Sequence, residues 1–372
     1  MQPVTVRSSS AGRLLFVDRL RAAAALGMIE THVFNTMLFS RARSSWWFVC
    51  LDFVNGLIAP TFLFVAGFVF VVSSSRKLEE LRAGGVVLRK ALRRIFGVWL
   101  IAYLLHIPRM SIKRLFQGYT GQEWLGLYRV DVLHCICFTW LFLLLSLYLT
   151  RSEQTLRLLW AASMAVFSLL APLMWSIDFL GMLPAPAAAY LNNKHYSLFP
   201  LFPWSAFMLA GALCASCYQQ ANRQQRESVF MAALGCVAVI AVLLGYRLPQ
   251  LLWLPGGGKT HWAADPRTFL LRLGLVLALL CAFWVYGLLR NIEQSWFLAA
   301  GRESLFIYVG HLIVLYLPVW RGSSLAYLVA RRYGVMGCTV GTVLFVAVMV
   351  LAARTWSRLK QKQVRTLSLL HA

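Results

Sequence analysis

Two residues spaced eleven apart near the start of the chain are of types that could carry out chemistry together. Arg21 and His32 lie in the apolar stretch FVDRLRAAAALGMIETHVFN, residues 16–35. In an α-helix, such residues return to within about 20° of one face and lie about 16 Å apart along the axis. An imidazole can accept a proton, and a guanidinium pairs well with phosphate. The spacing therefore predicts a cation and a titratable base on one wall of a helix bundle.

Further polar residues accompany this pair. Asp18 and Asn35 fall on the same stripe, and Arg19 and Glu30 are eleven apart on another face. An ionised group at the centre of a bilayer costs about 3 kcal/mol on insertion scales, so polar residues retained there indicate function. The alternative is structural, with a hydrogen-bonded histidine and an arginine whose head reaches the headgroups. For Glu30, a structural role and a role in the chemistry are equally open.

The second apolar run opens with a carboxylate that could orient the imidazole of His32. Asp52 and Asn55 lie at its start, after a short loop, so Asp52 is expected near the same end of the bundle as His32. A carboxylate bonded to one imidazole nitrogen fixes the tautomer and makes the other nitrogen a better base. The predicted catalytic dyad is His32 with Asp52. The alternative is that Asp52 only caps the second helix.

The elements that must position these residues are membrane-spanning helices. Of 372 residues, 60% are hydrophobic and 13% are charged, outside the range of soluble domains. Runs of roughly 20 apolar residues, long enough to cross about 30 Å of hydrocarbon, recur throughout. The prediction is an all-α, polytopic integral membrane bundle of about ten helices around a polar pore, forming one domain over 1–372 with tails at about 1–13 and 354–372. The expected spans are 14–38, 47–73, 92–107, 131–149, 157–176, 199–218, 228–246, 269–289, 304–320 and 334–353.

The distribution of basic residues predicts the orientation. The net charge is +23, and lysine and arginine gather between the second and third spans and after the last one. Because positive loops stay in the cytoplasm, both termini are expected there. Basic residues that flank apolar spans suit anionic lipid headgroups, so a nucleic-acid partner is not expected. The CxxC of Cys214 and Cys217 falls within a span without partner ligands, and no metal is expected.

Several segments together resemble a known family. The opening helix RLLFVDRLRAAAALGMIETH resembles that of the transmembrane acyltransferase superfamily, and the Arg21 to His32 spacing is similar to the signature of its acyltransferase-3 branch. APTFLFVAGFVF, DVLHCICF, LFPLFPWSAFMLAGAL and GRESLFIYVGH resemble segments of the heparan-alpha-glucosaminide N-acetyltransferase-like branch. The chain departs from the pattern where Ala22 replaces a usual Gly and His134 a usual Gln. The catalytic histidine of the lysosomal enzyme's luminal loop has no counterpart here.

The resemblance implies a membrane acyltransferase of the bacterial inner membrane. It would move an acetyl group from cytoplasmic acetyl-CoA to a hydroxyl or amine of an extracytoplasmic glycan, with His32 as general base or acyl carrier. The expected partners are the lipid bilayer, acyl-CoA and a glycan acceptor, and a homodimer is left open. Phosphates would be held by arginines, and polar or aromatic residues would line the pore: Arg19, Arg21, Arg93 and Arg94 for the first set, and Asp18, Glu30, Asn35, Asn55, His134, Trp204, Tyr308 and His311 for the second.

A second class of function is also open. A charged stripe in a bundle of about ten spans is typical of a proton-coupled secondary transporter, although no inverted repeat is evident. The segment PGGGKT, residues 255–260, lacks the first glycine of a phosphate-binding loop and is expected to form an outer turn. His261 and Asp265 in the same loop could touch a sugar acceptor, or the loop could simply anchor at the interface.

Overall fold

The fold of this chain is helical throughout the part that is described. The structure is a computed structural model, and it describes residues 14–107, 118, 120–194, 196–249, 262–290, 295–318 and 323–370, without the side chains of residue 295 and residues 364–370. In these ranges the only extended pairing is an isolated bridge between Leu38 and Tyr333. The predicted all-α class is confirmed.

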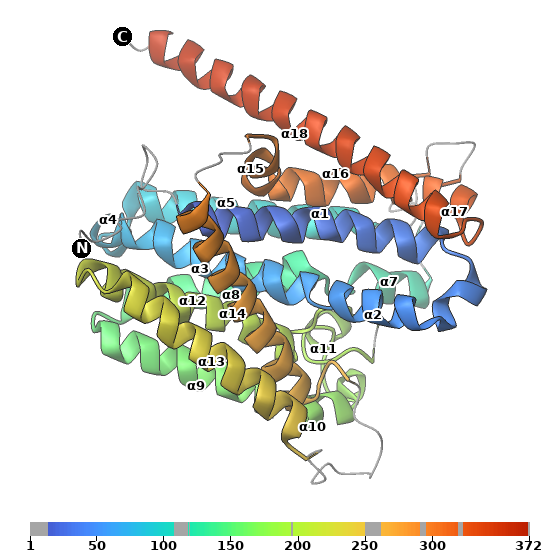
Figure 1. The fold of residues 1–372 in the computed structure, drawn as a ribbon. Helices are drawn as coiled ribbons and strands as arrows, with labels where there is room; N and C mark the ends of the chain where they lie inside the picture. Colours follow the sequence, from blue (N-terminus) through green and yellow to red (C-terminus); the bar gives the residue numbers. More distant parts are fainter. Residues whose placement is uncertain are drawn as a thin grey trace. The chain divides into compact units, whose positions relative to one another are not determined.

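The long helices follow the order of the apolar runs (Figure 1). They are α1 (Leu15–Met37), α3 (Ile58–Ser75), α5 (Gly85–Leu105), α8 (Val132–Leu149), α9 (Glu153–Leu169), α12 (Leu201–Arg223), α13 (Glu227–Arg247), α14 (Pro266–Leu289), α16 (Ser304–Tyr316) and α18 (Val335–Leu370). Shorter helices lie between them: α2 (Trp46–Asn55), α4 (Leu78–Arg82), α7 (Gly121–Leu127), α10 (Ala171–Ser176), α11 (Ala185–Ala188), α15 (Ser295–Arg302), α17 (Leu325–Val329) and the 3-10 turns η1 (Ser40–Ser44) and η3 (Phe179–Gly181).

The expected count of about ten spans is not confirmed. Among the described residues, six helices are long and apolar enough to cross a membrane, or seven if the broken helix of α15 and α16, bent by 85°, counts as one span. Helices α1 and α5 are not among these six, although their 23 and 21 residues are enough to cross a membrane. Both contain several ionisable residues in their interiors, which lowers their mean hydropathy. The chain is therefore a multi-pass helical membrane protein by composition and length.

Helix bounds differ from the sequence prediction in two basic segments. The expected third span begins at 92, but α5 begins at Gly85, so Arg93 and Arg94 lie well inside a helix. The predicted tail from 354 is also helical, because α18 continues to Leu370. Arginine and lysine are good helix formers, so a basic run after an apolar one extends a helix without a stop signal.

The chain forms two compact units. The first comprises Met1–Phe62 with Ala282–Ala372, and the second comprises Leu63–Cys281. In the first, α1 packs against α15, α16 and α18 through a buried apolar cluster that includes Ile29, Ile307 and Met349. In the second, α12 packs against α8 and α9, and α5 packs against α8. The unit boundaries fall inside α3 and α14, and the prediction of one domain remains a prediction.

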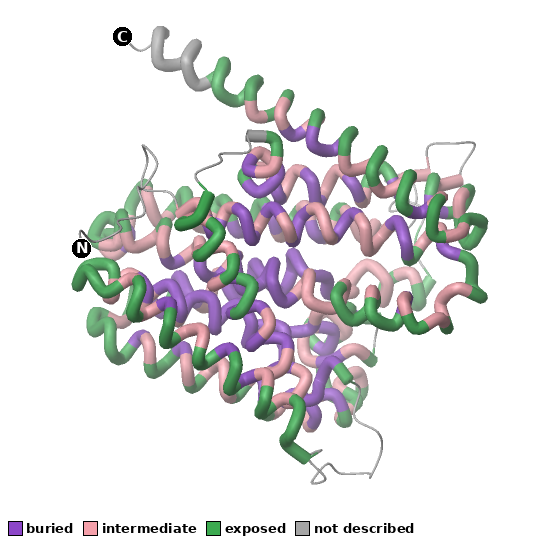
Figure 2. Tube along the Cα trace, viewed as in Figure 1, coloured by how far each residue is buried: buried purple, intermediate pink, exposed green. Residues whose placement is uncertain are grey.

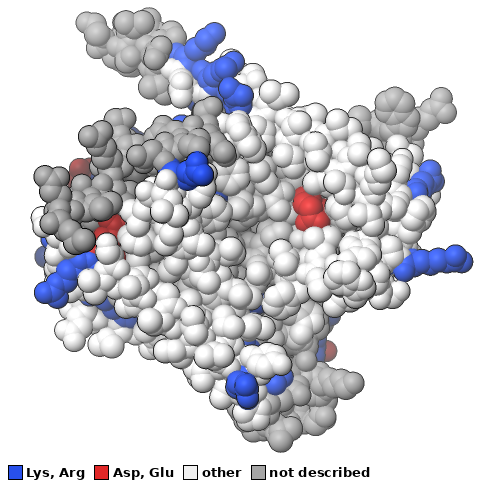
Figure 3. All heavy atoms as spheres, viewed as in Figure 1, with Lys and Arg blue, Asp and Glu red and all other residues white. Residues whose placement is uncertain are grey.

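The helices of the second unit differ strongly in burial. In α12, 83% of the most apolar stretch is buried inside the protein, whereas in α13 the buried share is 22%. Figure 2 shows α12 largely buried and α13 with many exposed residues. The face drawn in Figure 3 is mostly uncharged, with few lysine, arginine, aspartate or glutamate side chains. An exposed surface of this kind is suited to lipid.

Two glycines allow α3 and α12 to approach closely within the second unit. A Cβ added at Gly67 would lie 1.9 Å from the carbonyl oxygen of Met208, and one added at Gly211 would lie 1.9 Å from the carbonyl oxygen of Phe64. Only glycine permits backbone contact at both positions. Small residues at helix crossings are characteristic of membrane bundles, because close backbone approach replaces the hydrophobic driving force.

Candidate active site

Arg21 on α1 contacts the buried start of α16. Its Nε donates a hydrogen bond of 2.7 Å to the hydroxyl of Ser304, which is fully buried. Close packing of α15 on α1 supports this contact, since a Cβ at Gly301 would lie 2.4 Å from the carbonyl oxygen of Asp18. The guanidinium predicted from the sequence is thus fixed against a helix that begins 283 residues later in the chain.

His32 contacts the far end of the same helix. Its Nδ1 lies 3.2 Å from the hydroxyl of Tyr316, and its ring centroid lies 5.0 Å from that of His311. His311 is fully buried, with its Nδ1 2.8 Å from the carbonyl oxygen of Ile307. Because a carbonyl only accepts, His311 carries its proton on Nδ1. The ring of Tyr308 packs against His311 and stacks on Phe62.

The two contacts show that α1 and α16 run in the same direction. Arg21 touches Ser304 near the first residue of α16, and His32 touches Tyr316 at the last. The two α1 residues are about 16 Å apart along the helix. One pair of helices therefore carries a guanidinium at one end and two imidazoles with a phenol at the other. This is the polar seam of α1 and α16.

The predicted partner of His32 is not among the polar contacts that the structure describes for this residue. Asp52 is exposed on α2, and in the described part of the chain it forms neither a hydrogen bond nor an ion pair with His32. Asn55, at the end of α2, instead makes a side-chain hydrogen bond with Glu30. Glu30 Oε1 is buried without a hydrogen-bond partner among the described atoms. Asn35 is exposed, and its carbonyl oxygen accepts from Arg43.

The arginines expected to hold phosphate have different surroundings. Arg19 is only 5% exposed, and its guanidinium lies 5.0 Å from the ring centroid of Tyr286. Arg93 and Arg94 are exposed residues of α5, in the second unit, and Arg94 lies over the ring of Trp140. Burial and a cation–π contact are typical of an arginine with a packing role. The structure thus separates these arginines by environment.

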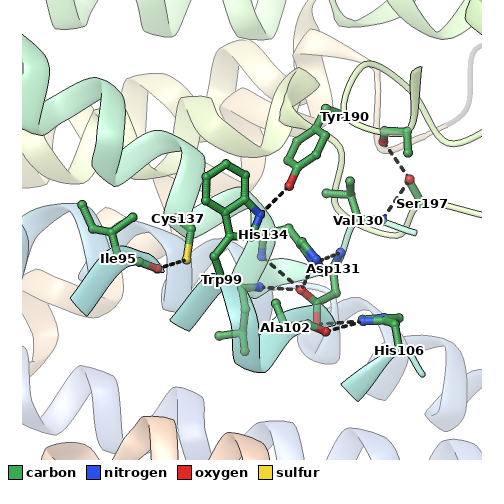
Figure 4. Close-up of polar contacts among 12 residues, drawn as sticks. Ile95, Trp99, Ala102, His106, Val130, Asp131, His134, Cys137, Tyr190 and Ser197 are labelled. Carbon is green, nitrogen blue, oxygen red and sulfur yellow. Dashed lines mark hydrogen bonds and ion pairs between the residues drawn. The ribbon is translucent and has the colours of Figure 1, made fainter. Parts of the chain in front are cut away.

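A second polar cluster lies where α5 ends and α8 begins. Asp131 caps α8, and its Oδ1 accepts hydrogen bonds from the backbone N–H groups of Leu133 and His134. The Nδ1 of His134 is 2.8 Å from the same oxygen. The Nδ1 of His106 is 4.0 Å from Asp131 Oδ2 and 2.8 Å from the carbonyl oxygen of Ala102. Figure 4 shows the carboxylate between the two imidazoles.

This cluster is enclosed by aromatic and apolar side chains. His134 is fully buried, and Asp131 is 4% exposed. The ring of Tyr103 lies T-shaped at 4.4 Å from that of His134. The ring of Tyr190 lies 6.3 Å from it, and its hydroxyl accepts a 2.8 Å hydrogen bond from Trp99. His134 Nε2 has no hydrogen-bond partner among the described atoms. The cluster of His106, Asp131 and His134 is therefore surrounded by apolar and aromatic side chains, and we call it the polar island.

The charges of this island follow from its geometry. Burial acts to raise the pKa of Asp131, but the hydrogen bond and charge of His134 outweigh it, so the pKa lies below its ordinary value. Burial lowers the pKa of His106, and the carboxylate of Asp131 opposes this only in part. Both residues lie just outside the helices that flank them. The island holds an ionised carboxylate beside a neutral His106 at pH 7.

The sequence prediction included only one member of this island, and as a lining residue. Asp131 and His134 have the Asp-x-x-His spacing of a capping box, in which the residue at the third helical position bonds back to the cap. That signal is readable without a structure. The approach of His106 is not, because it depends on α5 and α8 packing side by side.

The remaining predicted residues are placed as follows. Trp204 on α12 is 6% exposed and packs edge-to-face on Phe199. Asp265 makes an ion pair of 2.7 Å with Arg267 at the start of α14. Residues 255–260 and His261 lie outside the described residues.

Comparison with known proteins identifies the family of the chain. The family model described as heparan-alpha-glucosaminide N-acetyltransferase, catalytic, matches residues 13–250, which include Arg21, His32 and the island around Asp131. A comparison with curated protein sequences finds no match. The matched region covers more than half of the chain, and the chain is therefore a member of the heparan-alpha-glucosaminide N-acetyltransferase catalytic family, a family of membrane acetyltransferases.

Proposed function

We propose that this protein transfers an acetyl group from acetyl-CoA to a hydroxyl or amine of an extracytoplasmic glycan, with His32 as the reacting imidazole. The observation that carries the proposal is the family match over residues 13–250. The polar seam of α1 and α16 supports it, because Arg21 and His32 both face α16 and lie about 16 Å apart along α1. A pantetheine arm could extend along such a seam.

His32 acts through the nitrogen that does not contact Tyr316. When His32 carries its proton on Nδ1, this N–H donates a hydrogen bond to the hydroxyl of Tyr316, and Nε2 keeps a free lone pair. Nε2 then takes the proton of the acceptor as its oxygen or nitrogen attacks the thioester carbonyl, and the departing CoA thiolate recovers that proton. In the alternative route, Nε2 attacks the thioester carbonyl and expels CoA thiolate. The acceptor then attacks the acetyl-imidazole, which releases the imidazole, and the acceptor's proton goes to the thiolate. The role of Asp52 as a partner of His32 remains a prediction.

The donor enters from the cytoplasm in this proposal. Arg21 binds a phosphate or the carbonyl of the donor through its fork of N–H groups, and Arg19, Arg93 and Arg94 are further candidates for phosphate contact. The protein lies in the bacterial inner membrane with both termini in the cytoplasm, as the basic ends of α5 and α18 favour. Glycan acceptors lie on the opposite side. Assembly as a homodimer is a further prediction.

The test is acetyl transfer by the purified full chain in lipid nanodiscs. Radiolabelled acetyl-CoA is offered with glucosamine, which has a free amine, or with N-acetylglucosamine, which has only hydroxyls. We expect the label on at least one sugar and none without protein. Failure of acetyl-CoA to bind, together with proton-driven uptake of sugar into proteoliposomes, would instead establish the secondary transporter.

Arg21→Gln is expected to raise the KM for acetyl-CoA about 10–100-fold with a smaller change in kcat. The reason is that hydrogen bonds from charged groups contribute roughly 1.5–3 kcal/mol. The proposed bond from Arg21 to acetyl-CoA is made in the ground state and in the transition state alike. Steady-state kinetics with varied acetyl-CoA gives both constants. The matched control is Arg358→Gln on an exposed part of α18, where the KM should not change. An unchanged KM in Arg21→Gln removes the residue from donor binding.

A further inference from the structure

The island at the junction of α5 and α8 has the composition of a metal site. His106, Asp131 and His134 each offer one ligand atom, and these atoms all lie within 4.8 Å of one another. All three side chains are at most 6% exposed. Buried groups of this kind are otherwise hydrogen-bonded partners in a structural network, so the distances must decide whether an ion fits.

The distances are close to those of a zinc site. Zinc bonds to imidazole nitrogen and carboxylate oxygen at about 2.0–2.2 Å, which places neighbouring ligand atoms roughly 3.3 Å apart in a tetrahedron. The observed separations are 2.8 Å from Asp131 Oδ1 to His134 Nδ1 and 4.0 Å from the other carboxylate oxygen, Oδ2, to His106 Nδ1. They lie on either side of that value. His106 follows the last residue of α5, where its ring can turn from Ala102 toward an ion without disturbing the helix.

The electrostatics also suit a cation. The carboxylate of Asp131 lies between two imidazoles, and the N–H groups of Leu133 and His134 hold its side chain in place. Outer hydrogen bonds of this kind orient the ligands of metal sites. The opposing charge is Arg129, which acts on His106 through its positive charge.

We propose that His106, Asp131 and His134 bind one divalent transition-metal ion, with Zn²⁺ as the best match to two imidazoles and a carboxylate. No step of the proposed acetyl transfer passes through this site. Its effect is to fasten the end of α5 to the start of α8. It also goes beyond the sequence prediction, in which no metal was expected.

The test is the metal content of the full chain, purified in detergent with its affinity tag removed. The protein is incubated with Zn²⁺, freed of unbound metal by gel filtration and analysed by mass spectrometry. We expect about one Zn²⁺ per chain and a higher midpoint of thermal unfolding with Zn²⁺ than with chelator. Replacement by Co²⁺ should give the visible absorption of a nitrogen- and oxygen-ligated ion.

Two substitutions remove ligands but keep the cap of α8. Asparagine is as good an N-cap as aspartate, and glutamine is the usual third residue of a capping box. Asp131→Asn and His134→Gln should each lower Zn²⁺ affinity more than about tenfold and abolish the Zn²⁺-dependent rise in unfolding midpoint. Arg129→Gln should strengthen binding, because a repelling charge is removed.

Matched controls distinguish this site from other ligands. Asp178→Asn changes another capping aspartate, and His311→Gln changes another buried histidine bonded to the carbonyl four residues before it. Both should retain the metal. The proposal is overturned if the wild-type protein retains no Zn²⁺ or Co²⁺, or if Asp131→Asn and His134→Gln retain as much as the controls. If one of the two fails to fold, His106→Gln at the end of α5 decides the result.

Discussion

His32→Gln is expected to lower the rate of acetyl transfer about 10²–10⁴-fold, the usual contribution of a positioned general base. Glutamine has a similar volume and can still hydrogen-bond to the hydroxyl of Tyr316, but it cannot accept a proton at neutral pH. Binding of acetyl-CoA should be retained, because the guanidinium of Arg21 lies about 16 Å away along α1. Single-turnover transfer from radiolabelled acetyl-CoA and equilibrium binding of the donor measure the two effects separately.

Two further variants identify the partner that orients His32. Tyr316→Phe removes the hydroxyl that lies 3.2 Å from Nδ1, and Asp52→Asn removes the carboxylate that the sequence predicted in that role. If Tyr316 orients the ring, Tyr316→Phe lowers kcat and Asp52→Asn does not. The reverse result would show that Asp52 approaches His32 during turnover. A folded His32→Gln protein with wild-type transfer would exclude His32 from the reaction.

Gly67→Ala is expected to prevent assembly of a stable second unit. The new Cβ would lie 1.9 Å from the carbonyl oxygen of Met208, and a backbone atom cannot move aside as a flexible side chain can. Overpacking costs about 1–3 kcal/mol where side chains can adjust. The cost here should exceed about 3 kcal/mol, a large part of a typical free energy of unfolding of 5–15 kcal/mol. The measurement is the yield of monodisperse protein and its thermal midpoint in detergent.

The matched control is a glycine on another helix of the same unit. A Cβ at Gly97 in α5 would meet nothing within 4 Å, and alanine is favoured over glycine in a helix by about 1 kcal/mol. Gly97→Ala should therefore be as stable as the wild type or slightly more stable. Gly211→Ala should behave like Gly67→Ala, since its Cβ would meet the carbonyl oxygen of Phe64. Normal stability of both alanine variants at the crossing would show that α3 and α12 are farther apart in the protein.

The α-helical class and most of the helices could be predicted from the sequence, because they depend on local properties. Apolar runs long enough to cross a bilayer favour helices whatever they pack against. In lipid, a single segment can hydrogen-bond all of its backbone N–H and C=O groups only as a helix. The placement of Arg21 and His32 on one face of α1 follows from the helical period in the same way. The predicted helix bounds were wrong where no residue in the sequence marks the start or end of a helix. This is the case at Gly85, the first residue of α5, and in the basic extension of α18.

The partners of these side chains were decided by the tertiary structure alone. The sequence indicated that His32 needed a polar partner and offered Asp52, the nearest carboxylate along the chain after it. The contacts that the structure shows for His32 are with Tyr316 and His311, about 280 residues later. The apolar surfaces of membrane helices resemble one another, so composition does not specify which of them meet. That choice depends on small residues and close packing, as at Gly67 and Gly301.

The island around Asp131 shows the same division within one site. Its local half is the capping of α8 by Asp131 and His134. This capping depends only on four consecutive residues and needs no tertiary contact. Its other half, His106, comes from the end of α5, and no local sequence signal places that end beside the start of α8. The sequence by itself determined the helices and the polar residues they carry. Packing of one helix on another decided which polar residues meet, because that depends on shape complementarity between segments far apart in the chain.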